Sequence, residues 1–331
     1  LFEEERKIWG GMAEPGKDYS SKVLIKIEAV HAISPKEYPE KCPKKYKKLE
    51  YALFPVRTEQ GDPPKKLIIP PMSFDLKIRI LDASKKDEVM RSLQWWMTFG
   101  GIGARTRRGC GSVYCTDKLE QLHPVSREEA EAAGCEMIFP KEHILDDSIA
   151  AWQQAIEYLY EFRQGEKNGR KKRFGKSKWP EADAIRKKTG EWSLKHKPPV
   201  EAPILFPRAM FGMPIGFPFK SRSDNDKPSE TELLPMKNGV VYDRLASPLI
   251  LKVLATSKGK FRPVALLMPY FHMDDLGLNL KRKKGKTNWN FERGTWWNCS
   301  NADEAPPVKD YNGIDALTAF MNFFKNGGEK L

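Results

Sequence analysis

The sequence predicts an α+β protein made of two domains. Its 331 residues suffice for about two domains of roughly 100–200 residues each. Hydrophobic residues make up 40% of the chain, enough to build buried cores. Some segments alternate apolar and polar residues, as strands do, and others repeat apolar residues every three or four positions, as helices do. We therefore expect domains over residues 1–135 and 136–331.

The first domain is predicted to contain strands and one helix before a glycine-rich loop. Residues 23–28 alternate, with Val23, Ile25 and Ile27 on one face, and a second candidate strand passes through Tyr51 and Phe54. Residues 74–80 form the clearest strand. Ser84 is the expected cap of the next helix. Its apolar stripe consists of Val89, Leu93 and Trp96, and a short strand is expected at residues 112–115 beyond the loop.

The second domain is predicted to begin with a helix and to continue with strands. Residues 148–162 carry a helical stripe of Trp152, Ile156, Leu159 and Tyr160. Strands are expected over residues 209–219, 248–255 and 263–268, and the last two are apolar enough to be covered on both faces. A closing helix should pack Ile314, Leu317, Met321 and Phe324 on this sheet and stop at Gly327.

The charge of the chain favours a polyanionic partner. The formal net charge is +13, which points first to nucleic acid and only second to an anionic membrane surface. Between residues 163 and 188, eleven Lys and Arg face three acidic residues, a net of +8, so the charge is focused. No run of about 18 apolar residues occurs, so we expect no membrane-spanning helix.

The five cysteines are scattered and none has CxxC spacing. We therefore expect no zinc site, no disulfide framework and no cofactor, with reduced thiols in a cytoplasmic protein.

The segment 100–111, Gly-Gly-Ile-Gly-Ala-Arg-Thr-Arg-Arg-Gly-Cys-Gly, is the main candidate site. Glycines let the backbone approach a ligand closely, and arginine forks suit phosphate oxygens. The residues expected to grip a phosphate backbone are Gly101, Gly103, Arg105, Arg107, Arg108, Gly109 and Gly111. The alternative is a tight turn from helix to strand with surface arginines.

A second basic segment, residues 170–180, interleaves cations with aromatic residues. This mixture suits phosphate contacts combined with base stacking. Arg173, Lys176 and Lys178 are expected on phosphates, and Trp179 either on a base or packed beneath the loop. The alternative is a solvated basic loop, which is also the preferred interpretation of residues 281–286.

Catalytic patterns are weak. The five histidines lie in different predicted elements and none adjoins a plausible nucleophile. No metal-ligand spacing occurs either. We therefore expect a protein that is not an enzyme.

Four stretches carry a resemblance to a known family. Residues 100–113 resemble the C-terminal glycine-rich motif of the RAMP superfamily of CRISPR proteins. Together with residues 175–186, 206–215 and 244–249, they make the chain similar to the first subunits of Cmr effector complexes, which act in type III-B CRISPR antiviral defence.

This resemblance implies two tandem ferredoxin-like (RRM-like) domains. The first would lack its N-terminal strand and helix, because neither has room before Val23. It also implies a non-catalytic subunit that binds the 3′ part of the guide RNA (crRNA) and the target RNA beside other Cmr subunits, with no membrane partner. Arg208 and Arg244 are expected to face the same RNA, or to be members of structural ion pairs.

Two other functions remain open at this stage. A metal-independent RAMP endoribonuclease that processes CRISPR transcripts would need a general acid or base, for which His31 and His123 are the candidates in the first domain. A pure protein scaffold would use its charge for solubility alone.

Overall fold

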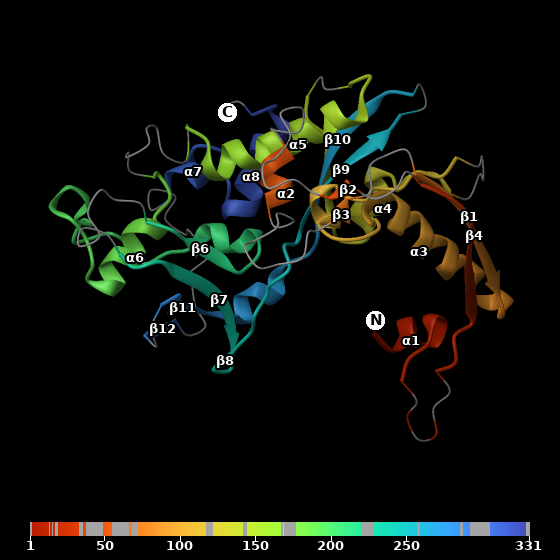
Figure 1. Ribbon diagram of the computed structural model, residues 1–331, viewed down its shortest axis with the longest axis horizontal. Helices are drawn as coiled ribbons and strands as arrows, with labels where there is room; N and C mark the ends of the chain where they lie inside the picture. Colours follow the sequence, from red (N-terminus) through yellow and green to blue (C-terminus); the bar gives the residue numbers. More distant parts are fainter. Residues whose placement is uncertain are drawn as a thin grey trace. The chain divides into compact units, whose positions relative to one another are not determined.

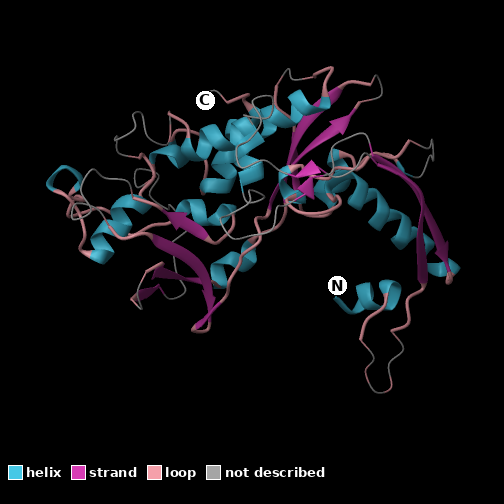
Figure 2. Ribbon diagram, viewed as in Figure 1, coloured by secondary structure: helices cyan, strands magenta, loops and turns pink. Residues whose placement is uncertain are grey.

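The computed structural model describes residues 2–32, 36–37, 49–54, 66–67, 72–116, 122–166, 168, 177–219, 228–291 and 305–328, except positions 13, 15, 17–18, 142–143, 257–258 and 285–286. The chain divides into two compact units. Unit 1 comprises Leu1–Arg105 and Gly111–Val125, and unit 2 comprises Thr106–Cys110 and Ser126–Leu331. Both units combine helices with antiparallel strands, which confirms the predicted α+β class (Figures 1 and 2).

Unit 1 is built on a two-stranded antiparallel ribbon of β1 (Val23–Ala32) and β4 (Met72–Ile80), as the alternation predicted. Near one end of the ribbon, α1 (Phe2–Trp9) and α3 (Lys86–Phe99) supply the apolar partners. A small core forms there from Ile8, Val23 and Val89, with Trp9, Ile78, Ile80 and Leu93 packed against it.

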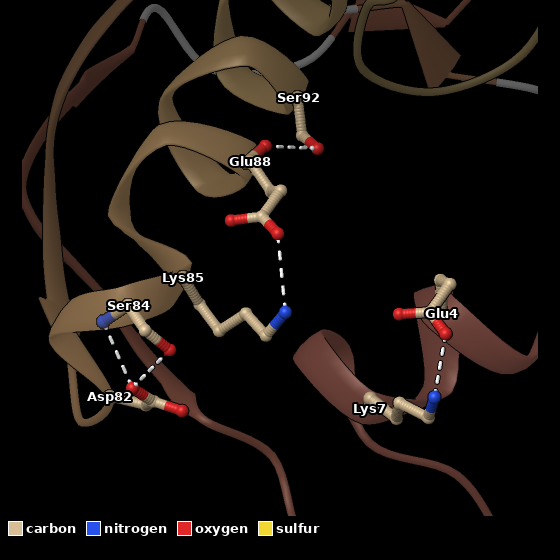
Figure 3. A network of polar contacts seen from close by, with 7 residues as sticks. All are labelled: Glu4, Lys7, Asp82, Ser84, Lys85, Glu88 and Ser92. Atoms are coloured by element: carbon tan, nitrogen blue, oxygen red, sulfur yellow. Dashed lines mark hydrogen bonds and ion pairs between the residues drawn. The ribbon is translucent and has the colours of Figure 1, made fainter.

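The start of α3 differs from the prediction. The carboxylate of Asp82 accepts hydrogen bonds from the backbone N of Ser84 at 2.9 Å and from its hydroxyl at 2.7 Å (Figure 3). Asp82 therefore caps the 3₁₀ turn η3 (Ala83–Lys85) that leads into α3, in the role predicted for Ser84.

Two strands predicted in the first domain are wrong. Residues around Tyr51 form a short helix, α2 (Glu50–Leu53), because Leu49, Ala52 and Leu53 are buried at helical spacing. Residues 112–116 are irregular, and among the described residues no strand lies beside them to supply the hydrogen bonds of a ladder. Unit 1 also contains the short pair β2 (Lys36–Glu37) and β3 (Lys66–Leu67).

Unit 2 contains a three-stranded sheet in the order β5 (Glu136–Ile138), β10 (Phe261–Leu267) and β9 (Leu249–Ala255). The last two confirm predicted strands. Two helices, α5 (Ser148–Gln164) and α8 (Ala316–Lys325), pack on this sheet and on each other (Figure 1). A third helix, α4 (Arg127–Ala132), contacts β5.

The packing faces of α5 and α8 largely follow the predicted stripes. On α5, Ile156 and Leu159 are buried, but Tyr160 is 41% exposed because the buried face runs through Tyr158 and Phe162 instead. On α8, Leu317, Met321 and Phe324 are buried. Ile314 lies before the capping residue Asp315 and is exposed, since it precedes the helix.

A second sheet of unit 2 has the order β12 (Asn288–Phe291), β11 (Gly277–Arg282), β7 (Thr231–Lys237) and β6 (Ile215–Phe217), and β8 (Val240–Val241) pairs with β7. The strand predicted over residues 209–219 is only partly correct. Its first part belongs to the 3₁₀ turn η7 (Pro207–Phe211), which begins with a proline, a residue suited to the first turn of a helix.

The remaining elements of unit 2 are short: α6 (Glu181–Thr189), η6 (Leu194–His196), η9 (Phe271–Asp275) and α7 (Pro306–Lys309). The tandem ferredoxin-like topology stays a prediction, as does the boundary after residue 135. In the described part of the chain, no helix is both long and apolar enough to cross a membrane.

Candidate nucleic-acid interface

The glycine- and arginine-rich loop is shared between the two compact units. Its beginning and end belong to unit 1, whereas Thr106–Cys110 belong to unit 2. Within unit 1 the loop is closed by a hydrogen bond from the backbone N of Ile102 to the carbonyl of Gly111, at 2.9 Å. A Cβ atom on Gly111 would lie 1.8 Å from the Ile102 carbonyl oxygen, so this glycine is required by the close approach of two backbone segments.

The tip of the loop is open. Ile102, Gly103 and Ala104 are exposed, and Gly101 before them is half-buried. Gly103 has φ +88°, and no atom lies within 4 Å of the position that its Cβ would occupy. The positive φ favours a glycine at this position. Because no atom lies close to it, the backbone of the tip is accessible to a ligand.

Arg105 lies at the end of this tip and is held by the protein. Its backbone has φ +63°, and its Nε donates to the carbonyl of Ala52 at 3.0 Å. The guanidinium is therefore oriented by the α2 segment of unit 1.

Arg108 is an internal residue of unit 2. Its side chain is buried, and its guanidinium donates to the carbonyl of Leu249 at 2.8 Å and to that of Phe211 at 3.3 Å. Its own carbonyl accepts a hydrogen bond of 2.6 Å from the Trp152 indole. In this arrangement the arginine binds carbonyl oxygens of the protein, which occupy the donors that were predicted to bind phosphate.

Gly109 is fixed by the same packing. With φ +83°, it lies so close to Trp152 that an added Cβ would be 2.6 Å from the indole nitrogen. The glycine therefore admits the indole that binds the Arg108 carbonyl.

Arg107 differs from its neighbour. Its side chain is half-buried, and its Nη1 donates to the Ser247 carbonyl at 2.5 Å. The guanidinium makes no second hydrogen bond with the residues that the structure describes. Since a guanidinium has five N–H donors, Arg107 is positioned by one bond and keeps donors for a ligand.

Arg244 lies three residues before Ser247 in the same irregular segment. Its side chain is exposed, and no described residue accepts a hydrogen bond from it. Arg107 is thus bound to Ser247 through its side chain, whereas Arg244 is near Ser247 in the sequence. We call Arg107, Arg244 and Ser247 the arginine patch.

Trp179 and Arg208 belong to the core of unit 2. The Trp179 side chain is 2% exposed and its ring meets Phe162 edge-on at 5.5 Å. Of the two predicted roles, the structure favours packing over stacking on a base. Arg208 donates from its backbone N and its Nε to one oxygen of the fully buried Glu181, at 2.9 and 3.1 Å. This geometry favours the structural ion pair that the sequence left open.

The rest of the basic segments is only partly described. Arg173 and Lys176 lie outside the described residues. The ammonium of Lys178 lies 3.6 Å from the Asp310 carboxylate. In the segment 281–286, Arg282 forms an ion pair with Glu191, and Lys283 with Glu230. The sequence predicts a solvated basic loop for this segment, but Lys281 and Arg282 end the strand β11. The two ion pairs agree with a charged surface in that interpretation.

Three of the four family-like stretches meet in unit 2. Arg108 joins residues 106–110 to Phe211 and Leu249, and the backbones of Met213 and Leu245 exchange two hydrogen bonds of 2.9 and 3.1 Å. Sequence reasoning named each stretch but could not predict that they converge, because the hydrogen-bonded partners are far apart in the chain.

The candidate catalytic residues lie in ordinary surroundings. His31 and His123 are both outside the buried core, and the Nδ1 of His123 lies 3.2 Å from the Gln94 amide and 3.0 Å from the Pro124 carbonyl. No group of three or more His, Cys, Asp or Glu that could hold a metal ion is found among the described residues.

Comparison with known proteins finds a family match for the first part of the chain. Residues 2–114 match the family model of the RAMP superfamily, which confirms the predicted resemblance for this segment and includes the glycine- and arginine-rich loop. Among solved structures, Cmr1 from Pyrococcus furiosus (apo form) is similar at 18% sequence identity and a TM-score of 0.41, over 87% of this chain and 77% of that one. A search of curated proteins found no match.

Proposed function

We propose that this chain is a non-catalytic RNA-binding subunit of a type III-B CRISPR (Cmr) complex, where it contacts the 3′ part of the guide RNA and its target beside other Cmr subunits. Its superfamily match and its four family-like stretches support the assignment to CRISPR proteins. The observation that carries RNA binding is the arginine patch. There, Arg107 is oriented by the Ser247 carbonyl and Arg244 is exposed in the same segment.

The chemistry of the patch suits a phosphate backbone. Two arginines with unused N–H donors can each grip phosphate oxygens through charge-assisted hydrogen bonds. The net charge of +13 adds a long-range attraction for a polyanion. The open backbone at Gly103 supplies a second place, in unit 1, where a ligand can approach closely.

The first test is RNA binding by the full chain over a series of salt concentrations. The double variant Arg107→Ala/Arg244→Ala should bind labelled guide RNA about tenfold more weakly. Its plot of log affinity against log salt should also be less steep, by about 0.7 for each phosphate that the variant no longer neutralises.

The matched control is Lys197→Ala/Lys284→Ala, which removes two cations elsewhere in unit 2. It should change affinity and slope far less, because separated surface charges act only through a screened field. Equal reductions in both double variants would mean that net charge alone attracts RNA, and the patch would be rejected.

The non-catalytic part of the proposal is tested with labelled repeat RNA, incubated with and without Mg²⁺. The RNA should remain intact. A defined product that disappears on substitution of His31 or His123 would instead establish an endoribonuclease. Crosslinking in the assembled complex should map the guide RNA 3′ region to Arg107 and Arg244.

A further inference from the structure

A β-hairpin of unit 2, formed by β7 and β8, has a well-defined turn. In its register Met236 pairs with Val241 and Lys237 with Val240, which leaves the two-residue turn Asn238-Gly239. Both turn residues have positive φ, 51° and 75°, the conformation that a tight hairpin turn of this kind requires. Beyond β8, the backbone N of Tyr242 donates to the Pro235 carbonyl at 2.9 Å, so the pairing extends to Tyr242.

The register places three exposed side chains on one face of this hairpin. Residues opposite each other in an antiparallel pair share a face, and side chains alternate along each strand. Lys237 therefore shares a face with Val240 and Tyr242, which are 56% and 49% exposed. On the opposite face Met236 is buried and its partner Val241 is 41% exposed, whereas Pro235, which lies opposite Tyr242, is buried. We call Lys237, Val240 and Tyr242 the hairpin face.

The hairpin leads directly into the arginine patch. Tyr242 is followed by Asp243 and Arg244, both exposed, and then by Ser247, whose carbonyl holds Arg107. Along this stretch, the exposed cations Lys237 and Arg244 and the half-buried Arg107 outweigh the single exposed acid Asp243. An exposed tyrosine ring between cations has the composition of a surface that binds single-stranded nucleic acid through stacking and phosphate contacts.

We propose that the hairpin face is a stacking platform for a base of single-stranded RNA, with Tyr242 against the base and with Lys237 and Arg244 on the adjoining phosphates. This inference rests on the proposed function and extends it from phosphate binding to base contact. The tight turn and the hydrogen bond from the Tyr242 backbone N to Pro235 fix the backbone that carries the ring before RNA arrives, so that little backbone entropy is lost on binding.

The test compares three single variants of the full chain in binding to a labelled single-stranded RNA. Tyr242→Ala should weaken binding about five- to tenfold, as expected when one base no longer stacks. Its salt slope should stay unchanged, because tyrosine carries no charge. Tyr242→Phe keeps a ring and should bind nearly as well as the parent chain. Tyr160→Ala removes a tyrosine of α5 that is 41% exposed, and should have no effect.

Two further measurements guard against an unfolded variant and a purely electrostatic effect. Circular dichroism should be the same for all three variants. Inorganic polyphosphate, which has no bases, should bind to Tyr242→Ala and to the parent chain equally. Ultraviolet crosslinking to RNA, mapped by mass spectrometry, should identify a peptide that contains Tyr242.

The outcomes separate this inference from the proposed function. If Tyr242→Ala binds RNA like the parent chain while Arg107→Ala/Arg244→Ala binds more weakly, the stacking platform is rejected and the RNA-binding function stands. Equal weakening in Tyr242→Ala and Tyr242→Phe would also reject stacking, since the hydroxyl group would then be responsible. If the parent chain binds no RNA, the proposed function fails and the inference fails with it.

Discussion

The tip of the glycine- and arginine-rich loop and the segment Thr106–Cys110 belong to the same loop but have different roles. At the tip, Gly103 faces open space and its neighbours are exposed. In Thr106–Cys110, Arg108 is 7% exposed and is bound to two backbone carbonyls, and Gly109 makes room for the Trp152 indole. One part of the loop is available to a ligand, whereas the other builds the interior of unit 2.

This difference shows that arginine and glycine by themselves do not define a phosphate site. A guanidinium is a set of fixed donors, and it binds carbonyl oxygens of the protein as readily as phosphate oxygens when both are within reach. Burial decides between the two. Arg107 and Arg108 are adjacent in the sequence, yet Arg108 is buried and binds the carbonyls of Leu249 and Phe211, whereas Arg107 is half-buried and binds only that of Ser247 among the described residues.

The largest effect is expected from Arg108→Ala. The substitution leaves the carbonyls of Leu249 and Phe211 unpaired in the interior, and should lower the free energy of unfolding by about 2–4 kcal/mol. Arg107→Ala, which removes one hydrogen bond from a half-buried site, should cost only about 1 kcal/mol. Urea titrations followed by circular dichroism measure both. Equal destabilisation would show that the two arginines do not differ as the structure indicates.

A second effect concerns Lys252, a buried lysine of β9 beside Cys110. Burial lowers the pKa of its ammonium to about 8, and the negative charge of the Cys110 thiolate acts in the opposite direction. Because the folded pKa lies below the unfolded value, the unfolded chain binds more protons between these pKa values. The contribution of Lys252 to stability should therefore rise as pH increases from about 8 to about 10.4.

The variant Lys252→Met isolates this contribution. At pH 7 it should be more stable than the parent chain by on the order of 2–3 kcal/mol, since no buried ammonium has to be desolvated. This advantage should shrink as the pH approaches about 10. Thermal unfolding at several pH values measures it, and a stability difference that is constant with pH would refute the shifted pKa.

The smallest effect is the difference between two glycine variants. Gly109→Ala places a methyl group 2.6 Å from the Trp152 indole nitrogen and should cost about 2–3 kcal/mol. Gly103→Ala shares the strained positive φ but meets no atom within 4 Å, so it should cost only about 1 kcal/mol. The difference between the two values, taken from urea midpoints, measures packing alone. Equal costs for the two variants would mean that Gly109 also faces open space.

Elements with a strong local period were predictable from the sequence. The strands β4, β9 and β10 and the helices α5 and α8 lie where the apolar pattern placed them. Where a prediction was wrong, the sequence nearby also contained the signal for the observed structure. Around Tyr51, aromatic residues suggested a strand, but the apolar spacing of Leu49, Ala52 and Leu53 favours a helix. Asp82 is a helix cap that lies two residues before the predicted one.

The hairpin face was missed, although a signal for it was present. Asn238-Gly239 between two apolar stretches is the strongest short-range indication of a tight hairpin, and its flanking residues Lys237 and Tyr242 follow from that turn. The ion pair between Arg208 and Glu181 had no such signal. The two residues are 27 positions apart, and charged residues of both types usually lie on the surface.

By itself, the sequence determined the α+β class, the main strands and helices, the positive charge and the resemblance of its first part to the RAMP superfamily, because these depend on composition and short-range spacing. Only the tertiary structure decided which arginine lies inside and which keeps its donors. The carbonyls that hold Arg107 and Arg108 are 140 and 141 residues further along the chain. No local pattern reports a hydrogen-bond partner at that distance, and burial removes a guanidinium from solvent only after the chain has folded around it.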